Sequence, residues 1–230
     1  MIATPPAPVA LSVAPAHVAL AAGARTTVRV SSRGHAGLLL RASVAGLALD
    51  VRGRPVIVAR RDAGSWLAVR PRVVRTERLG ASFTVVARRP AHARPGDHSA
   101  ILLVTALTPG RNRIAVGVRL GVVVTVRVAG RRVRRLAVVG ASLRGRLFSV
   151  TVANRGDVIE SFGSGALRIE VRRHKRTLAR FRAPRRWLLP HTRAVIAFRL
   201  RTSARGAAVA RVVLRQPAGA TSTRSFPLRL

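Results

Sequence analysis

The stretch Ile114-Ala-Val-Gly-Val-Arg-Leu-Gly-Val-Val-Val-Thr-Val-Arg-Val128 has a branched aliphatic residue at every even position. Strict alternation places one set of residues on each face of a pleated strand, so the stretch predicts a β-strand with one apolar face. At about 3.3 Å per residue it would span about 50 Å, whereas a usual strand has about 5–6 residues. We therefore expect it either to bend across two sheets or to carry the chain from one β-domain into the next.

The composition supports a folded, aliphatic protein. The chain has 230 residues, of which 48% are hydrophobic and only 3% aromatic, with two Trp, six Phe and no Tyr. This length fits one large β-domain or two domains of about 100–115 residues, and the apolar content excludes disorder for most of the chain. The cores must be built from Val, Leu, Ile and Ala.

The charge balance is extreme. Lys and Arg number 43 against 7 Asp and Glu, which gives a net charge of +36, and Lys175 is the only lysine. A GC-rich, actinobacterium-like codon pool explains the preference for Arg over Lys. It does not explain the scarcity of Asp and Glu, so we expect an anionic environment or partner.

Two anchors suggest a duplicated domain. Val28–His35 resembles Val150–Asp157 at an offset of 122 residues, and Trp66-Leu67 resembles Trp187-Leu188 at an offset of 121. A weaker match pairs Phe83–Val86 with Val195–Phe198. The repeat predicts that Trp66 and Trp187 occupy equivalent core positions.

Short alternating runs separated by Gly, Pro, Asn and Asp turns fill both copies. We expect strands near residues 9–13, 26–32, 38–44, 55–58, 66–69, 82–87, 99–106 and 114–128, then near 136–139, 147–153, 167–172, 177–181, 193–201, 207–215 and 223–230. The pattern predicts an all-β protein of two tandem immunoglobulin-like β-sandwich domains, residues 1–129 and 130–230, that meet near Val128–Arg132.

Two motifs resemble bacterial cell-surface immunoglobulin-like domains. Trp66-Leu67-Ala68-Val69-Arg70-Pro71 followed by Pro95-Gly96-Asp97-His98-Ser99-Ala100-Ile101-Leu102-Leu103-Val104 is similar to their W-L-x-V-x-P … P-G-x-Y/H-x-x-x-I/L-x-V pattern. With Asn154-Arg155-Gly156-Asp157-Val158 in the second copy, the chain resembles the WxL-interacting protein family. That resemblance implies a first domain that binds peptidoglycan and a second that binds a protein partner.

A more distant likeness is to pilus chaperones, two-domain sandwiches that lend an alternating strand to a subunit. The stretch Ile114–Val128 has the required pattern, because an exposed strand edge can pair with an extended peptide. The competing hypothesis is that Val116, Val118, Leu120 and Val122 face this protein's own core, and we prefer it at this point.

The candidate ligand site is basic. Arg131, Arg132, Arg134 and Arg135 cluster at the expected domain junction and could bind phosphate or carboxylate through bidentate guanidinium contacts. A short polar segment contains His92, Asp97, His98 and Ser99. Because Pro95-Gly96-Asp97 forms a turn, we interpret the histidines as solvated loop residues. We expect no metal, no cofactor and no catalytic residues. The chain has no cysteine, and its carboxylates suggest no acid/base pair.

These observations predict a non-enzymatic cell-envelope binding or scaffolding protein, whose partners are peptidoglycan or another anionic cell-wall polymer and a surface protein. The alternative is a periplasmic or surface chaperone that captures an extended strand. Nucleic acid is disfavoured, since the chain has no recognisable nucleic-acid motif and few aromatic residues for base stacking.

Nothing in the sequence predicts a transmembrane helix. Met1–Pro15 resembles the Pro/Ala-rich start of a mature exported domain, so we expect a signal segment upstream and an extracellular or cell-envelope location. The signal and the C-terminal anchor of the WxL-interacting family are not seen in the chain, which ends at Leu230, and this argues against direct membrane anchoring.

Overall fold

The computed structural model describes residues 10–33, 37–59, 63–77, 80–88, 90–108, 116–162, 165–216 and 219–230. Ile114, the first residue of the long alternating stretch, lies outside the described residues. Cα packing divides the chain into two units, Met1–Leu47 with Ile57–Gly130 and Ala48–Val56 with Arg131–Leu230. Within the second unit, the Val51 carbonyl accepts a hydrogen bond from the Val195 amide (2.7 Å).

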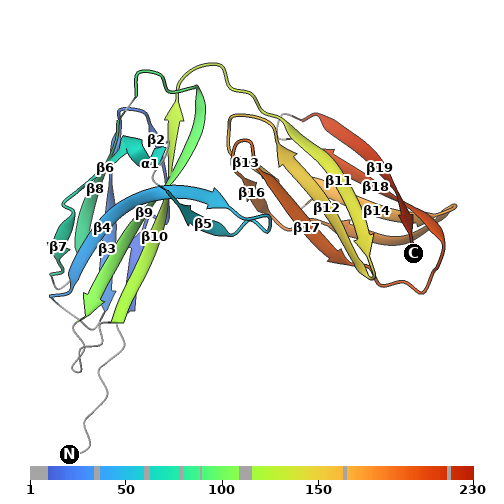
Figure 1. The fold of residues 1–230 in the computed structure, drawn as a ribbon, viewed down its shortest axis with the longest axis horizontal. Helices are drawn as coiled ribbons and strands as arrows, with labels where there is room; N and C mark the ends of the chain where they lie inside the picture. Colours follow the sequence, from blue (N-terminus) through green and yellow to red (C-terminus); the bar gives the residue numbers. More distant parts are fainter. Residues whose placement is uncertain are drawn as a thin grey trace, which may run out of the picture. The chain divides into compact units, whose positions relative to one another are not determined.

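The elements are almost all strands, which confirms the predicted fold class of two immunoglobulin-like β-sandwiches (Figure 1). The chain runs through β1 (Ala10–Ala14), β2 (His17–Ala21), β3 (Arg25–Arg33), β4 (Leu39–Leu49), β5 (Pro55–Val58), α1 (Ala63–Trp66), β6 (Leu67–Arg70), β7 (Val73–Arg75), β8 (Ala81–Ala87), β9 (Gly96–Thr108) and β10 (Val116–Val128). It continues through β11 (Leu136–Arg144), β12 (Leu147–Asn154), β13 (Glu160–Phe162), β14 (Leu167–Arg173), β15 (Arg176–Arg182), β16 (Arg186–Leu188), β17 (Arg193–Arg199), β18 (Ala207–Arg215) and β19 (Thr221–Arg229).

The first sandwich consists of two sheets. One has the strand order β1-β3-β8-β6, and the other has the order β2-β10-β9-β4-β5, with β7 also paired to β4. β1 and β2 follow each other in the chain but belong to different sheets, because the chain crosses between the layers at Pro15. The two sheets bury a shared core of Val, Leu and Ala around Phe83, as the scarcity of aromatic residues predicts.

The long alternating stretch forms β10, which pairs with β9 along all thirteen of its residues. The strand stays in one sheet, so the first of the two alternatives, a bend across two sheets, is wrong. The second alternative holds, because the first unit ends at Gly130, directly after β10, and the chain continues into the second unit at Arg131. Val122, Val124, Val126 and Val128 are buried, while Arg119 and Arg127 point to solvent. The period of two therefore identified the inward face of this part of the strand.

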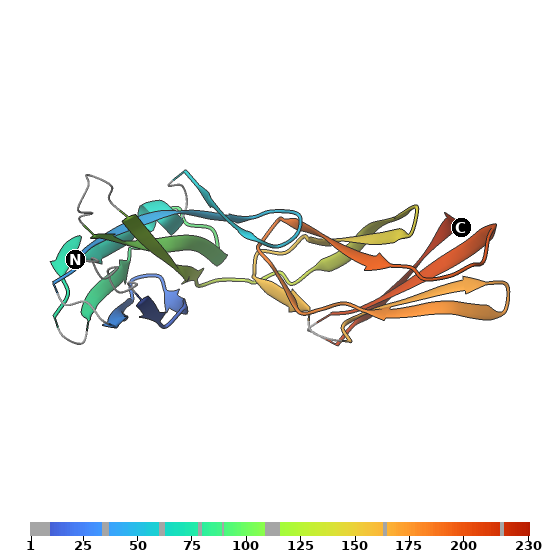
Figure 2. The ribbon, with the colours of Figure 1, turned by 90° about the horizontal axis from the view of Figure 1, so that it is seen from below.

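The second sandwich has one layer made of β11-β12-β17 and another made of β15-β14-β18-β19, with a short β13-β16 ribbon (Figures 1 and 2). Its core is centred on Phe148 and on aliphatic residues of both layers. β12 lies between β11 and β17 just as β3 lies between β1 and β8, and Val28 and Val150 are both fully buried on these central strands.

The tryptophan residues do not follow the repeat, so the prediction of equivalent core positions is wrong. Trp66 ends α1 and is half-buried against the first core. Trp187 lies on the three-residue strand β16 and is 39% exposed, whereas its neighbour Leu188 is buried. Successive strand residues face opposite ways, and here it is the leucine that faces inward.

Candidate strand-capture edge

The two edges of β10 are paired to different extents. Along one edge, β9 accompanies the whole strand. Along the other edge, β2 runs parallel to it and pairs only with Val123–Arg127. Among the described strands, none pairs with that edge of β10 over Val116–Val122, and we call this segment the free edge.

The segment that precedes β2 explains why the pairing of β2 with β10 stops at Val123. The Val123 amide donates to the carbonyl of Ala16 (3.1 Å), the residue that follows Pro15. Proline has no N–H to continue the ladder, and the preceding strand β1 pairs with β3 in the opposite sheet.

His17 lies where the pairing of β2 with β10 begins. It stands beside Val123 in the strand register, and its Nε2 shares a hydrogen bond with Thr125 Oγ1 at 3.1 Å. Burial, and then the nearby charge of Arg127, lower the pKa of His17 below its usual value. The part of β10 that pairs with β2 therefore begins beside a histidine that is neutral at neutral pH.

The side chains of the free edge are apolar but incompletely covered. Val118 and Leu120 are half-buried, whereas Val122 is fully buried. Leu11 and Val13 of β1 are also half-buried, and together with Leu120 they pack against the first core. The sandwich thus leaves aliphatic side chains partly exposed beside unpaired backbone groups, which is the arrangement that accepts an added strand.

The free edge also carries an exposed arginine. Arg119 points to the outer face of β10, and its Nε donates to Thr105 Oγ1 at 3.3 Å. At Gly121, a Cβ would lie 2.8 Å from Ile101 Cδ1, so the side chain of Ile101 occupies the space above this glycine.

The predicted basic cluster, Arg131, Arg132, Arg134 and Arg135, is exposed and lies between β10 and β11. Its backbone is bound to the turn at Asn154–Asp157: the Val133 amide donates to Asp157 Oδ1 (2.8 Å), and the Arg155 amide donates to the Arg135 carbonyl (2.7 Å). Arg134 Nη1 is 3.6 Å from Glu160 Oε2, and this carboxylate is buried. Arg134 therefore has a structural partner, and an anionic-ligand site at these four arginines stays a prediction.

His98 and Asp97 have separate partners. His98 Nε2 is 2.8 Å from the Arg94 carbonyl, and its ring centroid lies 4.5 Å from that of Trp66. Asp97 Oδ1 is 3.5 Å from Arg127 Nε. Within the part of the chain that the structure describes, no three His, Cys, Asp or Glu residues converge as metal ligands.

No family model and no curated protein matches the chain. Solved structures do resemble it over nearly its whole length. The class 5 fimbriae chaperone CfaA is 13% identical with a TM-score of 0.56, covering 94% of this chain and 98% of CfaA. The YadV chaperone is 15% identical with a TM-score of 0.54, covering 96% and 99%.

A third similar structure belongs to the CsuC–CsuE chaperone–tip adhesion subunit pre-assembly complex of Acinetobacter baumannii Csu pili. The matching chain is 12% identical with a TM-score of 0.53, covering 95% of this chain and 98% of that one. At these identities the likeness shows the fold, a two-domain β-sandwich.

These neighbours contradict the main prediction from the sequence, that the protein is a cell-envelope binding or scaffolding protein for an anionic polymer. All three are chaperones, one of class 5 fimbriae and one of Csu pili, and they favour the strand-capturing alternative. Among the described residues, no helix is long and apolar enough to span a membrane.

Proposed function

We propose that this protein is a chaperone of the cell envelope that captures an extended segment of a surface-protein subunit along the free edge of β10. The observation that carries the proposal is the unequal pairing of β10: Val123–Arg127 is covered by β2, and Val116–Val122 offers its backbone to a partner. The added strand would gain main-chain hydrogen bonds, and its alternate side chains would cover Val118 and Leu120. The role is one of binding and requires no chemical step.

The similar structures support this reading through what they are bound to. One neighbour is described as a chaperone–tip adhesin complex of CFA/I fimbriae, and another is the complex with the Csu tip subunit. Both resemble this chain across almost its full length. We infer by analogy that the partner here is also a subunit destined for the cell surface.

Replacing Val118 by serine is expected to weaken capture of a synthetic peptide of alternating Val and Thr residues by about five- to tenfold, because one apolar contact to the added strand is lost. The matched control is Val74→Ser, which changes a half-buried valine of β7, a strand that pairs with β4. Isothermal titration of both variants and of wild type measures the affinities, and thermal melts check that both variants are folded.

Two outcomes would contradict the proposal. One is an equal loss of affinity in Val118→Ser and Val74→Ser. The other is that wild type binds a scrambled peptide, with the alternation broken, as tightly as the alternating one.

A further inference from the structure

The second sandwich has a basic outer face that strand capture at β10 does not use. On β14 and β18, Ile169, Val171, Ala210 and Val212 are buried, so the residues between them point outward. Together with the residues of β15 that lie opposite them in the register, they form what we call the β14 face: Arg168, Glu170, Arg172, Arg180, Arg182, Val209, Arg211 and Val213.

Positive charges lie directly opposite each other on the β14 face. Arg168 pairs with Arg182 in the strand register, although like charges at directly opposed positions destabilise a sheet. In the described part of the chain, no ion pair involves Arg168, Arg182 or Arg211. The only acidic residue of the face, Glu170, already pairs with Arg180 Nη2 (3.3 Å). The face therefore carries positive charge that an external anion would neutralise.

A cavity of about 460 Å³ lies over this face. Arg168, Arg182, Arg211 and Val213 are among the residues that line it. Its volume is in the range of small-ligand sites, about 300–1,000 Å³. Because guanidinium groups bind phosphate oxygens through paired, charge-assisted hydrogen bonds, the cavity suits a phosphate group with a small substituent.

Aliphatic side chains lie between the arginines. In the register of β14 and β18, Val213 is opposite Arg168 and Val209 is opposite Arg172. Val209 is 45% exposed, and Val213 is half-buried. Basic residues mixed with aliphatic ones suit the surface of an anionic bilayer, where arginines meet lipid phosphates and apolar side chains enter between the headgroups. A nucleic acid backbone offers the valines no apolar partner, and Phe181 of β15 packs against the core instead of a base.

We propose that the β14 face binds the surface of an anionic phospholipid membrane. A lipid phosphate occupies the cavity between Arg168, Arg182 and Arg211, and Val209 contacts the headgroup region. Binding of this kind is peripheral and reversible. It does not depend on strand capture, because the β14 face belongs to the second unit and the free edge of β10 belongs to the first.

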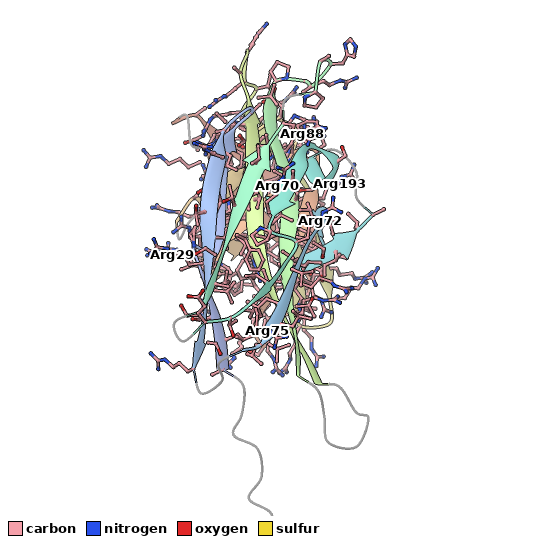
Figure 3. All side chains as sticks on the ribbon, turned by 90° about the vertical axis from the view of Figure 1, so that its left-hand side faces the viewer. Arg29, Arg70, Arg72, Arg75, Arg88 and Arg193 are labelled. Carbon is pink, nitrogen blue, oxygen red and sulfur yellow. The ribbon has the colours of Figure 1, made fainter. Side chains whose placement is uncertain are left out.

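The test must separate the β14 face from the general positive charge of the protein. Arginines of the first unit are exposed as well, among them Arg29, Arg70 and Arg88 (Figure 3). We would therefore measure cosedimentation with vesicles at about 0.15 M salt, where the Debye length is about 8 Å and distant charges are screened. The vesicles consist of phosphatidylcholine alone or of phosphatidylcholine with about one third phosphatidylglycerol.

Wild type is expected to bind the anionic vesicles and not the neutral ones. The double variant Arg168→Gln/Arg182→Gln should bind the anionic vesicles about tenfold more weakly. It should unfold at an equal or higher temperature, because it removes a repulsive pair. The matched control Arg193→Gln/Arg199→Gln removes the same charge from β17, in the other layer of the same sandwich, and should weaken binding less than about twofold.

A third variant tests the choice of a membrane over another polyanion. Val209→Ser should weaken binding to the anionic vesicles about threefold and leave binding to a DNA duplex unchanged. An equal loss in the two double variants would overturn the proposal, since binding would then follow net charge alone. If Arg168→Gln/Arg182→Gln lost duplex binding as much as vesicle binding while Val209→Ser changed neither, the face would be a nucleic-acid site and the proposal would be wrong.

Discussion

Replacing Phe83 by alanine is expected to lower the free energy of unfolding of the first unit by about 3–5 kcal/mol. Phe83 is completely buried on β8, where it pairs with Val28 in the strand register. The other buried residues of this core are Val, Leu and Ala, so none of them can supply another large ring to fill the cavity. The loss combines the lost transfer of the ring from water with the cost of the cavity.

Chemical denaturation followed by Trp66 emission measures this loss, because Trp66 belongs to the first unit. The control is Phe226→Ala on β19 in the second unit, followed by Trp187, where the ring is only half-buried and the loss should be smaller. A loss in Phe83→Ala equal to or below that in Phe226→Ala would contradict the described core.

Asn154→Ala is expected to destabilise the second unit by about 2–3 kcal/mol, because it leaves buried polar groups without partners. The Asn154 side chain is buried, and its Nδ2 donates to the carbonyls of Val158 (2.8 Å), Leu189 (3.2 Å) and Leu188 (3.3 Å). Its Oδ1 accepts from the Gly156 amide (3.0 Å). One side chain therefore connects the end of β12 to the segments around β13 and β16.

Denaturation of Asn154→Ala followed by Trp187 emission tests this, with Asn154→Asp as the matched variant. Aspartate keeps the acceptor for Gly156 but loses the Nδ2 donors, so it should also be destabilised at neutral pH. A loss below about 0.5 kcal/mol in both variants would show that these hydrogen bonds do not support the fold.

The sequence predicted the buried face of β10 correctly where the two-residue period of a strand is the only rule that acts. Alternation identified the inward face of Val122–Val128, since burial on one face is all that this pattern requires. It failed at Trp187, because residue identity in a remote repeat does not fix which way a three-residue strand turns its side chains.

The partial covering of β10 lay beyond the sequence. The hypothesis that Val116, Val118, Leu120 and Val122 all face the core holds for Val122, but Val118 and Leu120 are only half-buried, and the side chain of Val116 is outside what the structure describes. The difference arises where β2 begins, more than 100 residues earlier in the chain. Pairing between such distant segments is a tertiary event that local periodicity does not encode.

The basic cluster shows a different limit of the sequence. The run Arg131–Arg135 includes Arg134, which pairs with the buried carboxylate of Glu160. In a chain with a net charge of +36, the local density of arginine says little about which arginines have a structural partner.

Disulfide mapping of strand addition tests the proposed capture most directly. The chain has no cysteine, so Arg119→Cys places a single thiol on the exposed face of the free edge. A disulfide needs Cα atoms about 4.4–6.8 Å apart, a distance met by directly opposed residues of neighbouring strands. The control is Arg41→Cys on β4, where β7 and β9 occupy both edges.

The partner in this measurement is a set of alternating Val/Thr peptides that carry one cysteine at successive positions. We predict that Arg119→Cys forms a disulfide efficiently with cysteines on one face of the peptide and poorly with those at the intervening positions, while Arg41→Cys reacts weakly with all of them. Equal reaction of the two variants, or reaction independent of the cysteine position, would contradict strand capture at β10.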